Sequence, residues 1–155
     1  MASAFVDGSL SVEYKPAQNI HCVLEGNMPG DLNFGLTQIG QIAVNATDID
    51  RASSFYKDIL GMKHLFSIPI ASFFDCQGIM LMLALPSKPE FDHQSSIIYF
   101  NVDDIQQATE TLLARGVHFE EKPNLVADMG SYDLWMAFFR DSENNLMALR
   151  SQVAH

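Results

Sequence analysis

The chain repeats one pattern of predicted elements, and this internal repeat constrains its fold more than any other feature. Asp48-Ile49 recurs as Asp104-Ile105, an offset of 56 residues. Ala52 recurs as Ala108 at the same offset. In both copies a strand precedes the predicted helix and three short strands follow it. The order βαβββ therefore occurs twice, and such a duplication fixes the topology before any motif is considered.

Clear helix signals bound the first copy. Asp48 can accept hydrogen bonds from the amides of the first turn of a helix. Gly61 can adopt the left-handed conformation that is common just after the last turn of a helix. The turn Gln77-Gly78 separates its last two strands. The predicted elements are a strand at 39–46, a helix from Thr47-Asp48 to Leu60, and strands at 62–68, 71–76 and 79–85.

The second copy follows the same plan. Asp103-Asp104, followed by Gln106, resembles a capping box and opens the helix, which ends at Arg115-Gly116. The segment 123–133 is predicted to be a long loop between two strands, of the kind that often covers a site. The predicted strands lie at 96–102, 117–121, 133–140 and 145–151.

The repeat divides the chain into parts. Residues 1–36 form an N-terminal extension in which Asp7-Gly8 between apolar residues is typical of a hairpin, so a β arm is expected there. We expect the rest to form one compact domain, because a chain of 155 residues favours a single sizeable core. Its parts are a first module at 37–85, a linker at 86–95 and a second module at 96–151.

Composition limits the partners and the compartment. The formal net charge is -10 with 9 Lys and Arg residues, which argues against nucleic acid or an anionic membrane as a partner. Cys22 and Cys76 offer neither a zinc spacing nor a disulfide framework. Asp7 and Glu13 interrupt any signal peptide, and no segment approaches the roughly 20 apolar residues of a membrane span. We therefore expect a cytoplasmic protein with reduced thiols.

Alternation along three predicted strands separates two kinds of surface. One face is bulky and aliphatic, as required where helices cover a sheet. The other mixes small, polar, methionine and aromatic side chains, which is typical of a concave ligand site. The alternative is a second, less regular core. The mixed face carries Gln41, Ala43, Asn45, Met80, Met82, Ala84, Ile97, Tyr99 and Asn101.

These modules resemble the vicinal oxygen chelate superfamily, which includes glyoxalase I, bleomycin-resistance proteins and extradiol dioxygenases. The similarity spans roughly 39–151. The resemblance implies an α+β fold in which the two modules pair into an open, curved, eight-stranded mixed sheet around a cavity. It also implies a homodimer. The matching residues are Ile39–Val44, Asp48-Ile49 with Ala52, Phe55-Tyr56, Leu60-Gly61, Val102–Ile105 and Phe139–Leu149.

The same resemblance gives the positions of metal ligands in the metal-dependent members. Carried over by register, they are Gln41, Met82, Ile97 and Ala148. The last three offer neither an oxygen nor an imidazole nitrogen, and one amide oxygen alone does not hold a metal ion. Gln41 is then either a hydrogen-bonding group for a ligand or a satisfied core amide.

No nucleophile and base are visible together, so we assign no catalytic residue. Because the four ligand positions are unsuitable, we also assign no metal, and we assign no other cofactor. Trp135, the only tryptophan, could form a wall of the cavity or pack in the core. We predict a metal-free protein that binds an amphipathic, aromatic or cationic small molecule. The alternatives are a metal-dependent lyase, isomerase or dioxygenase, and a non-catalytic interaction domain. The predicted ligand-binding residues are Gln41, Asn45, Met82, Ile97, Tyr99, Trp135 and Ala148.

Overall fold

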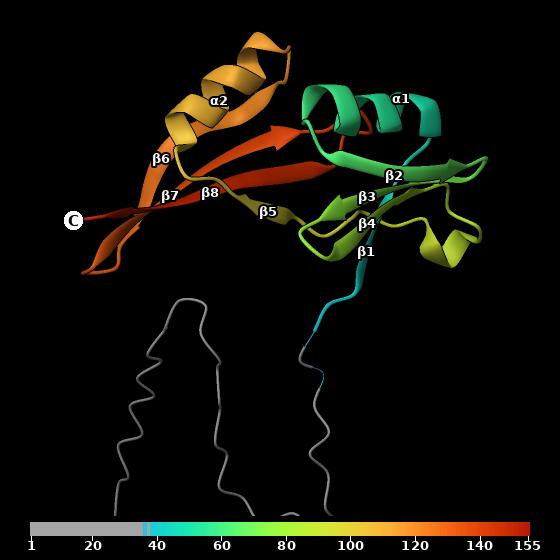
Figure 1. The fold of residues 1–155 in the computed structure, drawn as a ribbon, viewed down its shortest axis with the longest axis horizontal. Coiled ribbons are helices and arrows are strands. Elements are labelled where there is room, and N and C mark those ends of the chain that lie inside the picture. The colour runs from blue at the N-terminus through green and yellow to red at the C-terminus, as the bar shows by residue number, and fades with distance from the viewer. Residues whose placement is uncertain (1–35, 37) are drawn as a thin grey trace, which may run out of the picture. The chain divides into compact units, whose positions relative to one another are not determined.

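The computed structural model describes residue 36 and residues 38–155, and the predicted β arm lies outside the described residues. Figure 1 shows two sheets, each with a helix on one face. The elements in chain order are β1 (Gln41–Asn45), α1 (Ile49–Ser54), the π-helix η1 (Phe55–Ile59), β2 (Lys63–Ile68), β3 (Ala71–Cys76), β4 (Ile79–Ala84), the 3-10 helix η2 (Pro89–Phe91), β5 (Ile98–Asn101), α2 (Ile105–Ala114), β6 (Phe119–Asp128), β7 (Tyr132–Arg140) and β8 (Leu146–Ala154).

The eight strands form two four-stranded mixed sheets with equivalent topology. The strand orders are β1-β4-β3-β2 and β5-β8-β7-β6. The outer pairs β1 with β4 and β5 with β8 are parallel, and the other neighbours are antiparallel. The predicted α+β fold with two βαβββ modules is therefore confirmed. The hydrogen-bonded unit is the four-stranded sheet of each module, and neither sheet closes on itself.

The two helices start alike and end differently. Asp48 accepts a hydrogen bond from the Arg51 amide, and Asp104 accepts one from the Gln107 amide, so both are N-caps as predicted. The first helix then widens into the π turn η1, which adds one residue before the glycine that ends it. Gly61 and Gly116, both with positive φ, therefore lie 55 residues apart rather than 56.

The core lies between each sheet and its helix. Val44, Leu81 and Leu83 are buried under α1, while Ala137 and Phe139 are buried in the second module. These positions alternate along their strands with exposed or half-buried residues. The aliphatic face inferred from alternation is therefore the helix-covered face, and burial of these side chains is the main stabilising contribution.

The predicted loop at 123–133 is wrong, because β6 continues to Asp128 and only a short turn precedes Tyr132. Pro123 misled the prediction. It lies between two residues where the pairing with β7 shifts register, and β6 is an edge strand. A proline without an N–H group is tolerated at an irregular edge position. The segment is therefore a hairpin, and it does not form a long covering loop.

The turn between β7 and β8 packs against the first module and holds the two modules together through hydrogen bonds. The side chain of Glu143 in this turn is buried, with 1% of it exposed. Its carboxylate accepts hydrogen bonds from the Thr47 and Asp48 amides at 2.8 and 3.2 Å and from the Thr47 hydroxyl at 2.8 Å. The Arg51 guanidinium donates two more, at 2.8 and 2.9 Å. Burial opposes ionisation, but these bonds outweigh it and lower the pKa of Glu143 to about 2.

Two neighbours of Glu143 strengthen the same contact. Asp141 is buried and accepts a 2.8 Å hydrogen bond from the Tyr56 hydroxyl of the first module. Asn145 donates a 2.9 Å hydrogen bond to the carbonyl of Asn45. We call this set of contacts the module junction.

Within residues 36 and 38–155, no helix is long and apolar enough to cross a membrane.

Candidate functional site

The sheet surfaces that face away from α1 and α2 form what we call the open face. In the first module it carries Gln41, Ala43, Phe73, Asp75 and Met82, which alternate with the buried residues under α1. Both helices lie on the same side of the sheets in Figure 1, so no helix covers this face. Its side chains are the ones that a ligand or a second protein chain can reach.

Gln41 and Met82, two of the predicted ligand-binding residues, meet on the open face. The Gln41 side-chain nitrogen lies 3.5 Å from the Met82 sulfur. Met82 is paired in register with Phe73 on its other side, and the Phe73 ring stacks on Phe66 with 4.4 Å between centroids. The sequence left Phe73 and Phe74 undistinguished. Phe74 is fully buried, so Phe73 is the aromatic residue of this site.

The second module places an aromatic pair at the equivalent position. Tyr99, Ala148 and Phe138 follow one another across β5, β8 and β7 in register. The Tyr99 and Phe138 rings meet edge to face at 6.1 Å, and Ala148 beneath them is fully buried. Tyr99 is 44% exposed. Ile97 precedes β5 and is also exposed.

Two predicted ligand-binding residues have other surroundings. The Asn45 side chain donates hydrogen bonds of 2.8 Å to the carbonyls of Phe91 and His93, so it fastens the linker between the modules. Trp135 packs against the buried core cluster and lies on the same face of β7 as Ala137. The structure therefore puts Trp135 on the helix-covered side, away from Gln41 and Met82. The uniformly apolar run at 134–139 hides this alternation in the sequence.

The open face has balanced charge. Asp75 accepts a hydrogen bond from the Gly78 amide, and this bond, aided by Lys63, lowers its pKa. In the second module Arg150 donates a 3.1 Å hydrogen bond to the Asn101 side chain. A carboxylate and a guanidinium are thus both available at the margins of an otherwise apolar and amide-bearing surface.

The four positions that the family resemblance assigns to metal ligands do not suit a metal ion in this chain. An amide, a thioether and two aliphatic side chains do not form a ligand set for a divalent ion. Among the described residues, three groups with suitable ligand atoms lie together elsewhere. Asp128, Asp133 and His155 bring ligand atoms within 4.8 Å of one another at the turn of the β6–β7 hairpin. A hydrogen bond to Asp133 raises the pKa of His155.

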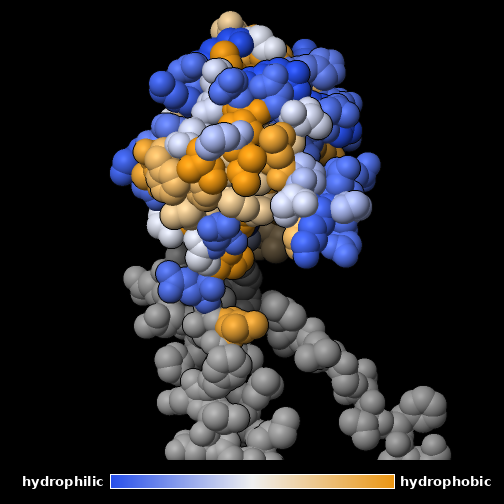
Figure 2. Space-filling view, turned by 90° about the vertical axis from the view of Figure 1, so that its right-hand side faces the viewer, coloured by the Kyte–Doolittle hydropathy of each residue, from blue (hydrophilic) through white to orange (hydrophobic). Residues whose placement is uncertain are grey.

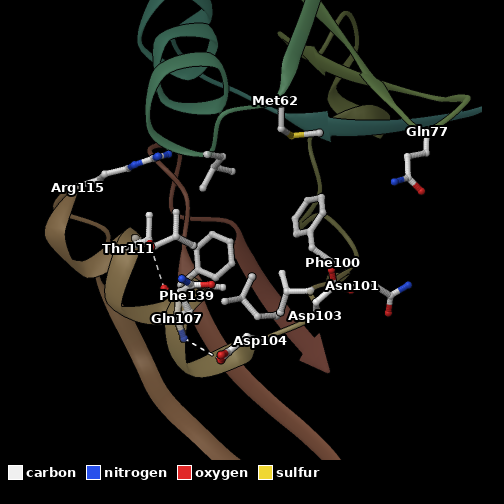
Figure 3. Close-up of a pocket in the computed structure, with 15 residues that line it drawn as sticks. Met62, Gln77, Phe100, Asn101, Asp103, Asp104, Gln107, Thr111, Arg115 and Phe139 are labelled. Atoms are coloured by element: carbon white, nitrogen blue, oxygen red, sulfur yellow. Dashed lines mark hydrogen bonds between the residues drawn. The ribbon is translucent and has the colours of Figure 1, made fainter. Parts of the chain in front are cut away.

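A separate cavity lies between the modules on the helix side, and Figure 3 shows it. We call it the junction hollow. Its volume is about 590 Å³. The floor is apolar, and the polar side chains of Asp103, Asp104, Gln107 and Arg115 surround it. Leu60, Met62 and Gln77 line it from the first module, and Leu112, Phe139 and Leu149 line it from the second.

The junction hollow was not predicted from the sequence. It depends on how the two modules approach each other, which alternation within one strand cannot show. Trp135 lines a second, smaller hollow on the same side with Gln106, Asp133 and Val153. Neither hollow includes Gln41, Met82, Tyr99 or Ala148.

Comparison with known proteins agrees with the fold. A curated relative, a glyoxylase-like domain-containing protein of Didymella fabae, is 26% identical over 122 residues, which cover 72% of this chain and 91% of the relative. A glyoxalase/bleomycin resistance protein/dioxygenase from Alicyclobacillus acidocaldarius is 21% identical, with a TM-score of 0.60 over 75% of this chain and 92% of its own. A lactoylglutathione lyase from Agrobacterium tumefaciens is 20% identical, with a TM-score of 0.58 over 74% of this chain and 93% of the lyase chain.

At these identities the structural similarity establishes the fold alone. The family assignment comes from the sequence. The pattern of the glyoxalase/bleomycin resistance protein/dioxygenase superfamily matches residues 38–149, which is most of the chain and includes both modules. The chain therefore belongs to the glyoxalase/bleomycin resistance protein/dioxygenase superfamily.

Proposed function

We propose that the protein binds a small amphipathic molecule, with an aromatic or cationic part, on the open face and without a metal ion. One observation carries this proposal. The amide of Gln41 lies against the Met82 thioether, at a position where a metal site would bring several oxygen or nitrogen atoms together. The side chains at the four positions that correspond to metal ligands are three apolar groups and one amide. They suit an apolar binding surface with a polar group that orients the ligand.

The contacts of such a ligand follow from the surface itself. Met82 with the stacked Phe66 and Phe73 offers a polarisable apolar area in the first module. Tyr99 with Phe138 offers an edge-to-face aromatic pair in the second. Burial of apolar ligand surface on these groups supplies affinity, and the Gln41 amide supplies orientation through its donors and acceptor.

We also propose that a second copy of the chain covers part of this surface. Leu65, Phe66, Ile68 and Ile70 are exposed on the edge strand β2 and the turn after it. Figure 2 shows apolar side chains gathered on the side of the molecule where β2 ends. An unpaired edge strand with exposed apolar side chains favours association, and a homodimer removes this surface from water.

Substitution of an aromatic residue on the open face tests the binding site. A panel of aromatic amines and alcohols is screened by thermal shift, since a ligand that binds only the folded state raises the midpoint. For the best compound, Tyr99→Ala is expected to raise Kd about tenfold, because an aromatic contact residue contributes on the order of 1–2 kcal/mol to binding. Isothermal titration measures this change.

The matched control is Leu113→Ala, which removes an exposed apolar side chain from α2 on the helix side. It is expected to leave Kd unchanged. Equal effects of the two substitutions, or no effect of Tyr99→Ala, would place the ligand elsewhere and contradict the proposed site.

A further inference from the structure

The ends of the two helices can be compared residue by residue. In the first module the Met62 amide donates to the Tyr56 carbonyl, and in the second the Val117 amide donates to the Leu112 carbonyl. Tyr56 and Leu112 are also separated by the offset of 56 that relates the two N-caps. They therefore occupy equivalent positions in the two modules.

The first module fills the space next to this position completely. The Tyr56 ring is fully buried and lies 5.9 Å from the Phe74 ring. Its hydroxyl donates a 2.8 Å hydrogen bond to Asp141, which the five-residue turn at 141–145 brings from the second module. An aromatic ring with one hydrogen-bonding group thus completes the packing there.

The second module lacks each of these parts. Leu112 replaces the ring of Tyr56, and Thr111 stands at the position of Phe55. The turn that approaches from the first module has only Gln77 and Gly78 between β3 and β4, so it cannot reach as far as the turn at 141–145. The space left between the modules is the junction hollow of about 590 Å³. Figure 3 shows Thr111, Gln107 and Phe139 around it.

We propose that the junction hollow binds a small aromatic molecule with one hydrogen-bonding group, which completes the second module as the Tyr56 side chain completes the first. Leu112, Phe139 and Leu149 supply the apolar floor for the ring. Within residues 36 and 38–155, the side-chain amides of Gln77 and Gln107 form no hydrogen bond in the protein, so they can bind the polar group of the ligand. A mostly apolar cavity of this size with a few polar groups suits such a ligand.

The charges at the rim select among aromatic molecules. Asp103 and Asp104 lie on one side of the hollow, and the formal net charge of the chain is -10. Arg115 lies on the other side, where it donates a 2.7 Å hydrogen bond to the carbonyl of Ile59. The carboxylates disfavour an anionic ligand in their neighbourhood, so the hollow prefers a neutral or cationic ring to a carboxylated one.

The experiment is a titration of the full chain with 4-methylphenol, the free equivalent of a tyrosine side chain, followed by amide chemical shifts in NMR. Saturable shifts are expected at Gln77, Thr111 and Leu112, with Kd on the order of 1 mM for so small a ligand. 4-Methylbenzoate, which adds a negative charge to the same ring, is expected to bind about tenfold more weakly.

Two substitutions fill the hollow with the residues of the first module. Thr111→Phe acts from the exposed side of α2, and Leu112→Tyr acts from the floor; each is expected to weaken binding of 4-methylphenol more than about tenfold. Glu110→Phe, which adds the same ring at the neighbouring exposed position outside the hollow lining, is the matched control and should bind like the wild type. Thr111→Phe is an exposed substitution, so it preserves the test if Leu112→Tyr does not fold.

Three results would overturn the inference. The first is the absence of saturable shifts around the hollow up to the solubility of 4-methylphenol. The second is a set of shifts that maps to Tyr99 and Phe138 on the open face instead. The third is an affinity that neither Thr111→Phe nor Leu112→Tyr changes.

Discussion

Glu143→Gln is expected to lower the free energy of unfolding at pH 7 by about 2 kcal/mol, because it removes the buried anion of a half-buried ion pair. The wild-type carboxylate accepts five hydrogen bonds from Thr47, Asp48 and Arg51. A glutamine side chain has one acceptor oxygen instead of two. Its NH2 group would face groups of Thr47, Asp48 or Arg51 that are themselves hydrogen-bond donors. The magnitude lies below that of a fully buried pair because the Arg51 side chain is 52% exposed. Urea denaturation followed by circular dichroism measures the change.

The same substitution alters the dependence of stability on pH. The pKa of Glu143 is lowered from 4.5 to about 2 in the folded protein, so ionised Glu143 stabilises the fold above about pH 5. This stabilisation decreases as the pH falls from about 5 toward 2, where the folded-state carboxyl takes up its proton. The variant cannot titrate at this position. Its loss of stability with acid is therefore expected to be smaller than that of the wild type.

Glu110→Gln on α2 is the matched control, since it removes the same charge from an exposed position. It is expected to change the free energy of unfolding by less than about 0.5 kcal/mol. Equal stabilities of Glu143→Gln and Glu110→Gln would show that the module junction does not depend on the carboxylate of Glu143.

Phe66→Asp is expected to convert the proposed homodimer into a monomer. Phe66 lies on the edge strand β2, is 48% exposed and stacks on Phe73. An aspartate there places a charge in the apolar dimer contact. Loss of a central aromatic contact typically costs about 2 kcal/mol or more of binding free energy, which corresponds to about a thirtyfold rise in the Kd of the dimer. Light scattering is expected to give twice the chain mass of 17.3 kDa for the wild type and the chain mass for the variant.

Ser87→Asp, in the exposed linker, adds the same charge outside this surface and is expected to remain a dimer. A wild-type mass of one chain at micromolar concentration would remove the dimer from the account. A dimer that survives Phe66→Asp would place the interface on another surface.

The fold was predictable because several local signals agree. Asp48 and Asp104 are caps in the structure as in the sequence, and the leucines of β4 are buried as their alternation predicts. Such agreement between capping, alternation and turn residues specifies elements without knowledge of distant contacts. The positions Gln41 and Met82 also follow from strand register, and the structure brings their side chains together.

The features that were missed depend on contacts between distant segments. Pro123 was interpreted as part of a loop because the sequence does not show that β6 is an edge strand. Trp135 lies in the uniformly apolar run at 134–139, where both faces of the strand look alike until the position of α2 is known. The junction hollow is lined by residues of both modules. None of these is determined by residues that are close in sequence.

Binding without a metal ion at the open face is the central claim, and metal analysis of the purified protein tests it most directly. The protein and its His155→Gln variant are isolated without chelators and analysed by mass spectrometry for zinc, nickel, manganese and iron. The variant removes the only imidazole of the cluster formed with Asp128 and Asp133, so metal held there does not obscure the result. The account predicts no stoichiometric metal in the His155→Gln variant. One equivalent retained by that variant and lost when Gln41→Ala is added would contradict it.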